Sequence, residues 1–519
     1  MKLLKSTATV GGATILSRIL GFVRDVVLAK MFGASGETDA FFLAFRIPNF
    51  MRRLFAEGSF SLAFVPVLSE YKANGDHEAL RDLIDHVTGT LAAILLVITS
   101  IGIFAAPLVL SVFAPGWLAD DRPEFNLSAG MLRITFPYIL LISLTALAGG
   151  ILNTFERFLI PALTPVLLNL SLIAAALLLA EHMAVPVTAL AWGVLLAGVV
   201  QLLLQIPALM RLGLMPRPRW GWRHSGVRRI LKLMIPTLFG SSVAQVNLLI
   251  DSIIATFLVT GSVSWLYYSD RLLEFPLGVF GIALATVILP NLSQKHAKAS
   301  TAEFSATLDW ALRLAVLITV PAAVGLVILA QPILITLFQY DAFQAEDVRM
   351  SAYSLVAYSA GLPAFIAVKV LAPGYYARQD TSTPVKIAIA AMGTNMLLNL
   401  VFVGLLLNKG FEGPHAGLAL ASSVAAYLNA ILLYRGLRKR AVYQPEKGWV
   451  SLWLSVILAC ATMGALLVFM TNDIDSWLQA NAVLRVKNLG LIILFGVILY
   501  LFTTMLTGVK KHHLLRGAK

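Results

Sequence analysis

The stretch 449–470 reads WVSLWLSVILACATMGALLVFM and contains no charged side chain. An α-helix needs about 20 apolar residues to cross the hydrocarbon core of a bilayer, which is about 30 Å thick. This stretch is therefore long and apolar enough to span a membrane as a single helix. Cys460 within it is the only cysteine of the chain, so no internal disulfide can form, and burial statistics favour a packing role for it.

Runs of the same kind recur along the whole chain. Hydrophobic residues make up 58% of the 519 residues and charged residues only 13%, whereas about 25% is usual in soluble proteins. The sequence predicts an all-α polytopic membrane protein with about fourteen transmembrane helices. The expected spans are 8–31, 39–68, 84–113, 130–153, 160–180, 185–210, 230–258, 264–292, 309–338, 351–376, 384–407, 415–435, 449–470 and 486–508.

The charges between these spans alternate in sign along the chain. The net charge of +13 is concentrated in the segments 211–232, 435–447 and 510–519, whereas the connectors 120–124 and 341–347 are acidic. This alternation is the positive-inside pattern of membrane proteins, and it argues against a nucleic-acid-binding surface. With an even number of spans, it predicts a bacterial inner-membrane protein with both termini in the cytoplasm.

The chain also repeats itself at an offset of 224 residues. Pro66 and Ser69 in SLAFVPVLSEYKA correspond to Pro290 and Ser293 in IALATVILPNLSQKHA. Each repeat holds six expected helices, an even number, so both enter the membrane in the same sense, as in transporters that work by alternating access around a central cavity. The predicted domains are a six-helix lobe at 1–222, a second six-helix lobe at 223–440, and two extra helices with a basic tail at 441–519.

Ionisable residues occur inside the expected spans, where each costs several kcal/mol and normally faces a cavity or a partner. Asp39, Arg46, Arg53 and Glu57 fall on one face of a single helix at 100° per residue. Around the first two spans, six basic residues accompany four acidic ones. A surplus of guanidinium groups suits an anionic substrate, because arginine can bind two phosphate oxygens at once.

A structural explanation of these charges stays open. Arg53 and Glu57 are four residues apart and could pair, as could Arg24 with Asp25 or Asp39. The second lobe carries fewer such residues, namely Asp251, Asp270, Arg271, Glu274 and Lys369.

Three segments carry a resemblance to a known family. They read SRILGFVRDVVLAKMFGASGETDAFFLAFRIPNFMRRLFAEGSFSLAFVPVLSEY at 17–71, SWLYYSDRLLEFPLGV at 264–279 and KVLAPGYYARQDTSTPVKIA at 369–388. They resemble the MurJ (MviN) lipid II flippases of peptidoglycan synthesis, within the multidrug/oligosaccharidyl-lipid/polysaccharide exporter superfamily. The resemblance implies a transporter, not an enzyme, that moves undecaprenyl-pyrophosphoryl-disaccharide-pentapeptide from the cytoplasmic to the periplasmic leaflet. It also implies that the last two helices form a groove for the polyprenyl tail.

The resemblance and the intramembrane charges together give the candidate site. Arginines of the first two helices and of the eighth are implied to engage the diphosphate and sugar. The candidate substrate-binding residues are Arg18, Arg24, Arg52, Arg53 and Arg271. The candidate cavity or gating residues are Asp25, Asp39, Arg46, Glu57, Asp270, Glu274 and Lys369.

The sequence predicts no cofactor, and no HExxH, CxxC or His-x-His spacing indicates a metal site. Coupling to the membrane potential is expected, since moving one charge through 100 mV changes the free energy by about 2.3 kcal/mol. A monovalent cation could contribute at Asp251 with Asn395 or Asn399, although Asp251 could equally pair with Lys369 or a backbone donor. The expected partners are lipid II, the phospholipid bilayer and cell-wall synthesis proteins.

Other functions stay open at this point. An exporter of another polyprenyl-diphosphate-linked glycan would share the diphosphate, so charge does not distinguish it. An exporter of cationic drugs would need a surplus of acidic residues in the first lobe, which this sequence lacks. A membrane glycosyltransferase or phosphatase would need an aspartate-rich motif or a large catalytic loop, and neither is found. A cell-wall scaffold that transports nothing would leave the membrane charges without a role.

Overall fold

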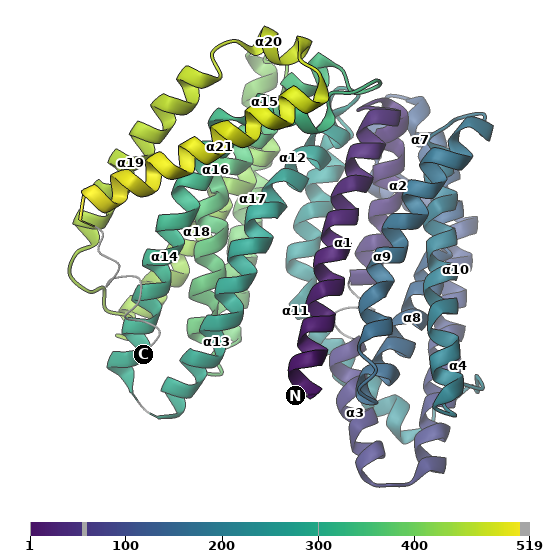
Figure 1. Cartoon of the computed structure of the whole chain (residues 1–519). Helices are drawn as coiled ribbons and strands as arrows, with labels where there is room; N and C mark the ends of the chain where they lie inside the picture. Colours follow the sequence, from purple (N-terminus) through teal and green to yellow (C-terminus); the bar gives the residue numbers. More distant parts are fainter. Residues whose placement is uncertain (1, 54–59, 299, 509–519) are drawn as a thin grey trace. The chain divides into compact units, whose positions relative to one another are not determined.

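The computed structural model describes residues 2–53, 60–298 and 300–508 (Figure 1). Within these ranges every regular element is a helix and no strand is present, which confirms the predicted all-α class. Contacts divide the chain into two compact units, unit 1 at Met1–Ser264 and unit 2 at Trp265–Lys519.

Unit 1 is built from long helices joined by short connectors. These helices are α1 (Lys2–Phe32), α2 (Gly36–Arg52), α3 (Ser61–Ala73), α4 (His77–Phe104), α5 (Ala106–Phe113), α6 (Pro115–Ala119), α7 (Pro123–Thr135), α8 (Tyr138–Thr154), α9 (Leu159–Ala174), α10 (Thr188–Arg211) and α11 (Ser225–Ala255). A π-helical turn (Ala175–Leu179) and a 3₁₀ turn (Ala180–His182) extend α9.

Helix α12 (Ser262–Pro276) begins in unit 1 and continues into unit 2, where a π-helical turn (Leu277–Gly281) leads into α13. The remaining helices are α13 (Ile282–Ala297), α14 (Thr301–Ile328), α15 (Ala330–Phe338), α16 (Ala345–Tyr376), α17 (Ser382–Asn408), α18 (Ala416–Lys439), α19 (Trp449–Met470), α20 (Ile474–Gln479) and α21 (Ala482–Leu506).

Eleven of the described helical segments are long and apolar enough to cross a membrane, and each overlaps one of the expected spans. The expected span 8–31 lies within α1, and the expected span 230–258 overlaps α11 but extends three residues beyond its end at Ala255; each helix is 31 residues long. The expected span 39–68 is divided between α2 and α3, with residues 54–59 outside the described part. The number fourteen therefore stays a prediction.

Two expected spans, 84–113 and 309–338, are wrong as single helices. The first breaks at Ala105 between α4 and α5, and the second breaks at Leu329 between α14 and α15. Pro107 and Pro332 follow these breaks. Proline is tolerated in the first turn of a helix, where its missing N–H would have no partner within the helix, so Pro107 and Pro332 fit the starts of α5 and α15.

The boundaries of the helices reproduce the internal repeat. The ends of α4 and α14, Phe104 and Ile328, are 224 residues apart, and so are their starts and the ends of α3 and α13. Because even the helix breaks recur at this offset, the two halves share one helix order, which confirms the predicted parallel repeat. Helices α19–α21 come after the second copy of the repeat in the chain and are not part of it.

One helix, α11, packs against the half of the chain to which the repeat does not assign it. Helix α11 is the repeat counterpart of α1, but it packs against α3, α4 and α5 of unit 1. The boundary drawn by contacts therefore follows Ser264, whereas the repeat predicts a boundary at 222/223. The predicted domain limits 1–222, 223–440 and 441–519 stay predictions.

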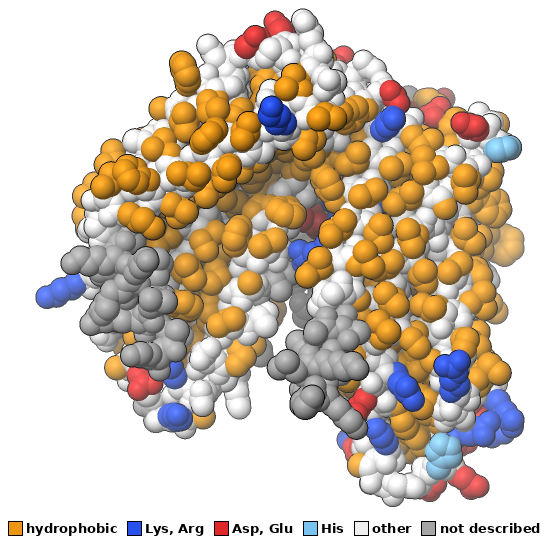
Figure 2. Space-filling model, in the orientation of Figure 1, with side chains coloured by type: hydrophobic (Ala, Val, Ile, Leu, Met, Phe, Trp, Pro, Cys, Tyr) orange, Lys and Arg blue, Asp and Glu red, His pale blue; other side chains and the backbone are white. Residues whose placement is uncertain are grey.

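Apolar side chains cover much of the outside of both units. Figure 2 shows them across the face of each unit, with most of the charged side chains toward the ends of the helices. Phe104 and Phe469 expose 85% and 82% of their surface. Such exposure is unfavourable in water and favourable in lipid. Together with the eleven apolar helices, it identifies a multi-pass membrane protein.

Candidate substrate-binding residues and their partners

Arg24 and Asp25 form a buried ion pair on α1. The Arg24 Nε and Nη2 atoms donate to Asp25 Oδ1 over 3.0 and 2.6 Å, and Nη1 donates to Asn169 Oδ1 over 3.0 Å. Asn169 lies on α9 and donates to the Ser17 carbonyl, so it joins the two helices. The guanidinium plane is therefore fixed from two sides.

Arg18 lies on the same helix, about 9 Å from Arg24 along the axis at 1.5 Å per residue. Its side chain is exposed, whereas Arg24 is only 6% exposed. The two candidates therefore differ in environment. Arg18 is accessible to a ligand, but Arg24 can bind one only if the ligand reaches a buried ion pair.

Asp39 caps the first turn of α12. Its Oδ2 accepts from the Gly261 N–H and its Oδ1 from the Ser264 N–H, both over 2.7 Å, and the Ser264 hydroxyl also donates to Oδ1. Backbone N–H groups at a helix start lack partners within the helix, and a carboxylate there also complements the helix dipole. Asp39 therefore holds the beginning of α12 from α2. The sequence left Asp25 and Asp39 open as partners of Arg24, and the structure pairs Arg24 with Asp25.

Arg46 supports the predicted polar face of α2. Its Nη1 donates to the Ser252 hydroxyl on α11 and lies 3.5 Å from the Leu248 carbonyl oxygen. Asp39 and Arg46 thus both face the segment that runs from α11 into α12, as their spacing on one helical face predicts. Asp251 is buried beside Ser252 with 4% of its surface exposed.

The end of α2 carries the next two candidates. Arg52 donates from Nε and Nη2 to Asn49 Oδ1 over 3.0 and 2.9 Å. Arg53 is the C-cap residue of α2 and is half-buried. Glu57 lies outside the described residues, so the pairing of Arg53 with Glu57 stays a prediction.

In unit 2, Arg271 is held by two neighbours on α12. Its Nη1 donates to Glu274 Oε2 over 2.7 Å, and its guanidinium carbon lies 5.1 Å from the centre of the Tyr267 ring. Asp270, Arg271 and Glu274 are all half-buried. Arg271 thus resembles Arg24 in having an acidic partner close by in sequence, but it is far more exposed, at 32% of its side chain.

The other candidates of unit 2 lie on α16 and α17. Lys369 on α16 is exposed. Asn395 and Asn399 on α17 are buried, and Asn399 Nδ2 donates to Asn395 Oδ1 over 3.1 Å. Asn395 donates in turn to the Ser422 hydroxyl on α18. These amides are arranged within unit 2, and the cation site with Asp251 stays a prediction.

A buried polar cluster that the sequence did not indicate fixes the connector before α19. Asp309 on α14 accepts from Arg313 Nε and the Tyr443 hydroxyl over 2.6 Å, and from Trp449 Nε1 over 2.8 Å. Arg313 also donates to the carbonyls of Glu446 and Lys447. Burial and the hydrogen bond to Asp309 raise the pKa of Tyr443 above its usual range, so its hydroxyl stays a donor.

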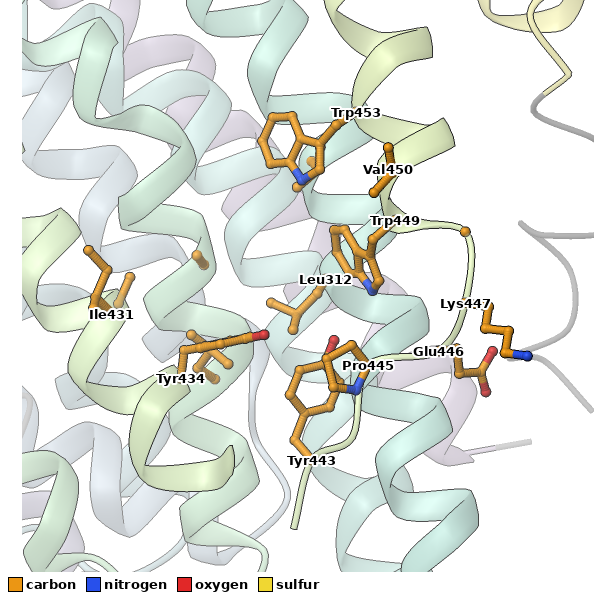
Figure 3. Close-up of a pocket in the computed structure, with 15 residues that line it drawn as sticks. Leu312, Ile431, Tyr434, Tyr443, Pro445, Glu446, Lys447, Trp449, Val450 and Trp453 are labelled. Carbon is orange, nitrogen blue, oxygen red and sulfur yellow. The ribbon is translucent and has the colours of Figure 1, made fainter. Parts of the chain in front are cut away.

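An apolar pocket of about 680 Å³ adjoins this cluster (Figure 3). Tyr434 from α18 and Trp449 and Trp453 from α19 line it, while Glu446 and Lys447 extend away from these rings. Aromatic and aliphatic walls favour an apolar ligand. The pocket therefore suits a hydrocarbon chain better than a sugar or phosphate group.

The connector between α16 and α17 is held by Asp380. Its carboxylate accepts from the Thr383 hydroxyl over 2.7 Å and the Thr383 N–H over 3.0 Å, and it pairs with Arg440 over 2.5 Å. The hydrogen bonds from Thr383, followed by those from Arg440 and Ser382, hold the pKa of Asp380 well below its usual range. These contacts explain the polar QDTST segment within 369–388 as a turn that starts α17.

Asp380→Asn is expected to lower the melting temperature at pH 7. Because the folded-state pKa of Asp380 is depressed, its stabilisation is complete above the unfolded value of 3.8 and declines as the pH falls further. The difference between wild type and variant should therefore shrink below about pH 3.8. Thermal unfolding of the purified protein at several pH values measures this. A difference that stays constant into the acid range would contradict the assignment.

Comparisons with known proteins agree with this arrangement. Residues 28–487 match the family model described as "Lipid II flippase MurJ". A protein of Haemophilus influenzae named "Probable lipid II flippase MurJ" is 48% identical over 514 residues, which cover 97% of this chain and 99% of the relative.

Solved structures give the same result. The structure titled "Lipid II flippase MurJ, inward closed conformation" matches with a TM-score of 0.79 at 28% identity, covering 96% of this chain and 98% of that chain. An inward-facing multidrug resistance transporter of the MATE family, in the MOP superfamily, matches with a TM-score of 0.68 at 14% identity, covering 82% and 94%, which shows a shared fold. The chain is thus a member of the MurJ lipid II flippase family.

Proposed function

We propose that this protein translocates lipid II from the cytoplasmic to the periplasmic leaflet of the bacterial inner membrane. The observation that carries the proposal is the 48% identity to a relative named for this activity, over nearly the full length of both chains. The helix order and the internal repeat support it, because parallel repeats are typical of transporters with alternating access. The protein acts as a transporter and not as an enzyme.

The arrangement of the arginines supports a role in binding the diphosphate. In unit 1, Arg24 is oriented by Asp25 and Asn169, and in unit 2, Arg271 is oriented by Glu274. A diphosphate offers the same bidentate geometry as a carboxylate and more negative charge. It can therefore compete with the acidic neighbour for each guanidinium group. Without substrate, the acid keeps the charge compensated and the side chain in place.

Arg18, Arg52 and Arg53 complete the proposed set of diphosphate ligands in unit 1. Arg18 is exposed and the other two are half-buried, so each is more accessible than Arg24. The polyprenyl tail would remain in apolar surroundings. The exposed apolar faces of α19 and α21 and the aromatic pocket beside α19 support that placement.

We further propose that both termini lie in the cytoplasm and that the membrane potential assists transport. The basic segments 211–232 and 435–447 would then face the cytoplasm. An inside-negative potential favours outward movement of an anionic head group by about 2.3 kcal/mol per charge and 100 mV. We also propose that a monovalent cation binds at Asp251 and that the protein contacts cell-wall synthesis proteins.

Depletion of this protein in living cells tests the proposed activity. The fraction of lipid II accessible to a periplasmic probe is measured together with the total pool of lipid II. We expect accessibility to fall while the total pool rises, and re-expression to reverse both. Unchanged accessibility with accumulation of another polyprenyl-linked glycan would show a different substrate. Unchanged accessibility of every such glycan would favour a scaffold.

A further inference from the structure

Two histidines and an aspartate, none of them a candidate substrate-binding residue, converge in unit 1. Asp82 and His86 are one turn apart on α4, and His224 immediately precedes α11. His86 Nδ1 lies 3.2 Å from Asp82 Oδ1, and His224 Nε2 lies 3.2 Å from Asp82 Oδ2. One ligand atom from each residue lies within 4.8 Å of the other two. His224 is far from the other two in sequence, so no short motif indicates this cluster.

These separations fit the coordination of a small divalent cation. Zinc binds histidine nitrogens and carboxylate oxygens at about 2.0–2.2 Å, and most often with tetrahedral geometry. Neighbouring ligands in such a tetrahedron lie about 3.3–3.5 Å apart. Both measured O···N separations are close to this edge length. Two of the three edges of such a site are therefore already in place, and the two histidine nitrogens, within 4.8 Å of each other, have to approach further around the ion.

The connector before α11 is shaped for close contact with α4. A Cβ atom on Gly221 would lie 2.6 Å from His86 Cβ, so only glycine allows the backbone to pass there. The Gly221 N–H donates to the Thr90 hydroxyl, and the rings of His86 and His224 stack with centroids 5.0 Å apart. The two imidazoles are thus brought together by packing that does not depend on an ion.

The cluster is also accessible from outside. A cavity of about 600 Å³ adjoins it, lined by His86, Trp220, Trp222, Arg223 and His224 among others. The side chains of Asp82, His86 and His224 are 43%, 21% and 18% exposed. An ion can therefore enter, and a water molecule can occupy a fourth position.

We propose that Asp82, His86 and His224 form a binding site for a divalent transition cation, with zinc as the best fit. Two imidazoles and one carboxylate with a water molecule are a common zinc ligand set. Binding through His224 Nε2 places the ring proton on Nδ1, so the hydrogen bond from the Gly226 N–H to Nδ1 is given up. His86 Nδ1 likewise exchanges its contact with the Asp82 carbonyl, 2.9 Å away, for the ion. It also requires Arg219, which lies 3.9 Å from Asp82 and is 60% exposed, to turn toward solvent.

The bound ion would fasten the connector to α4 at the point where α11 begins. It would therefore stabilise the entry of α11 into unit 1, where α11 packs against α3 and α4. This site is independent of the transport proposal. Its test measures binding, not flipping, so either proposal can fail without the other.

Zinc binding to the purified full-length chain tests the site, after removal of any polyhistidine tag and of bound metal with a chelator. Titration with Zn²⁺ is followed by calorimetry and by the melting temperature. We expect one high-affinity ion per chain and a rise in melting temperature, because a ligand that binds only the folded state stabilises it. His86→Gln and His224→Asn should each weaken binding by at least about tenfold.

The variants are chosen to separate coordination from folding. The asparagine in His224→Asn can still accept the Gly226 N–H, so the start of α11 keeps its cap. His77→Ala removes an exposed histidine from the same helix, α4, and should leave zinc binding unchanged. Absence of a stoichiometric ion in the wild type would overturn the proposal. So would equal zinc affinity in the wild type and the double variant His86→Gln/His224→Asn.

Discussion

Arg24→Ala is expected to abolish lipid II translocation while the protein remains in the membrane. The substitution removes a guanidinium group that is oriented by Asp25 and Asn169 and that we propose as a diphosphate ligand. Loss of a buried charged hydrogen-bonding group at a binding site costs about 2–5 kcal/mol, a factor of at least thirty in affinity. The measurement is the periplasmic accessibility of lipid II in depleted cells that express the variant, with membrane levels of the protein recorded in parallel.

Arg24→Ala also leaves Asp25 buried without its ion-pair partner, so a structural defect must be separated from a defect in substrate binding. The double variant Arg24→Ala/Asp25→Asn removes both charges and should recover the amount of folded protein without recovering translocation. Recovery of translocation in the double variant would show that Arg24 serves only to neutralise Asp25. Arg122→Ala is a control for the loss of an arginine paired with a nearby acid, because Arg122 pairs with Asp120 in a connector and also donates to the Leu258 carbonyl. The Arg122→Ala variant should translocate lipid II normally.

Asp309→Ala is expected to destabilise unit 2 by about 3–5 kcal/mol, the usual cost of removing one member of a buried ion pair. The substitution leaves the Arg313 guanidinium, only 8% exposed, without its acid, and it leaves Tyr443 and Trp449 without their acceptor. Thermal unfolding of the purified protein in detergent measures the loss.

Two further variants show whether the charge or the hydrogen bonds of Asp309 matter more. Asp309→Asn retains an acceptor oxygen and should lose less stability than Asp309→Ala. Asp120→Ala breaks an exposed pair with Arg122 and should change stability by at most about 1 kcal/mol. If Asp309→Ala unfolds at the same temperature as Asp120→Ala, the cluster does not hold the connector in place.

The long helices could be predicted from the sequence because their apolar runs are continuous. Residues 449–470 form α19 with the same limits that the composition gives. The breaks at Ala105 and Leu329 were missed because the apolar runs continue across them. The prolines that follow each break were visible in the sequence, but proline also lies inside continuous helices such as α14 and α16, so it does not mark a break by itself.

Partners of the site residues were harder to predict than the residues themselves. Intramembrane charge alone singles out Arg24 and Asp39, because a charge in lipid needs a reason to be there. Asn169 contacts Arg24 from 145 positions away in the sequence, and uncharged side chains are too common to stand out. Asp39 is bound mainly by backbone N–H groups, which every residue but proline possesses. Such contacts leave no pattern in the sequence.

The position of α11 has a consequence for biosynthesis. Because α11 packs against α3, α4 and α5, unit 1 cannot reach its final packing when the ribosome has completed only the first copy of the repeat. The surfaces of α3, α4 and α5 that contact α11 therefore stay unpacked in the bilayer until α11 has been inserted. The first copy of the repeat and the first cooperative folding unit are therefore different lengths of polypeptide, and truncation after residue 222 should yield a fragment prone to degradation.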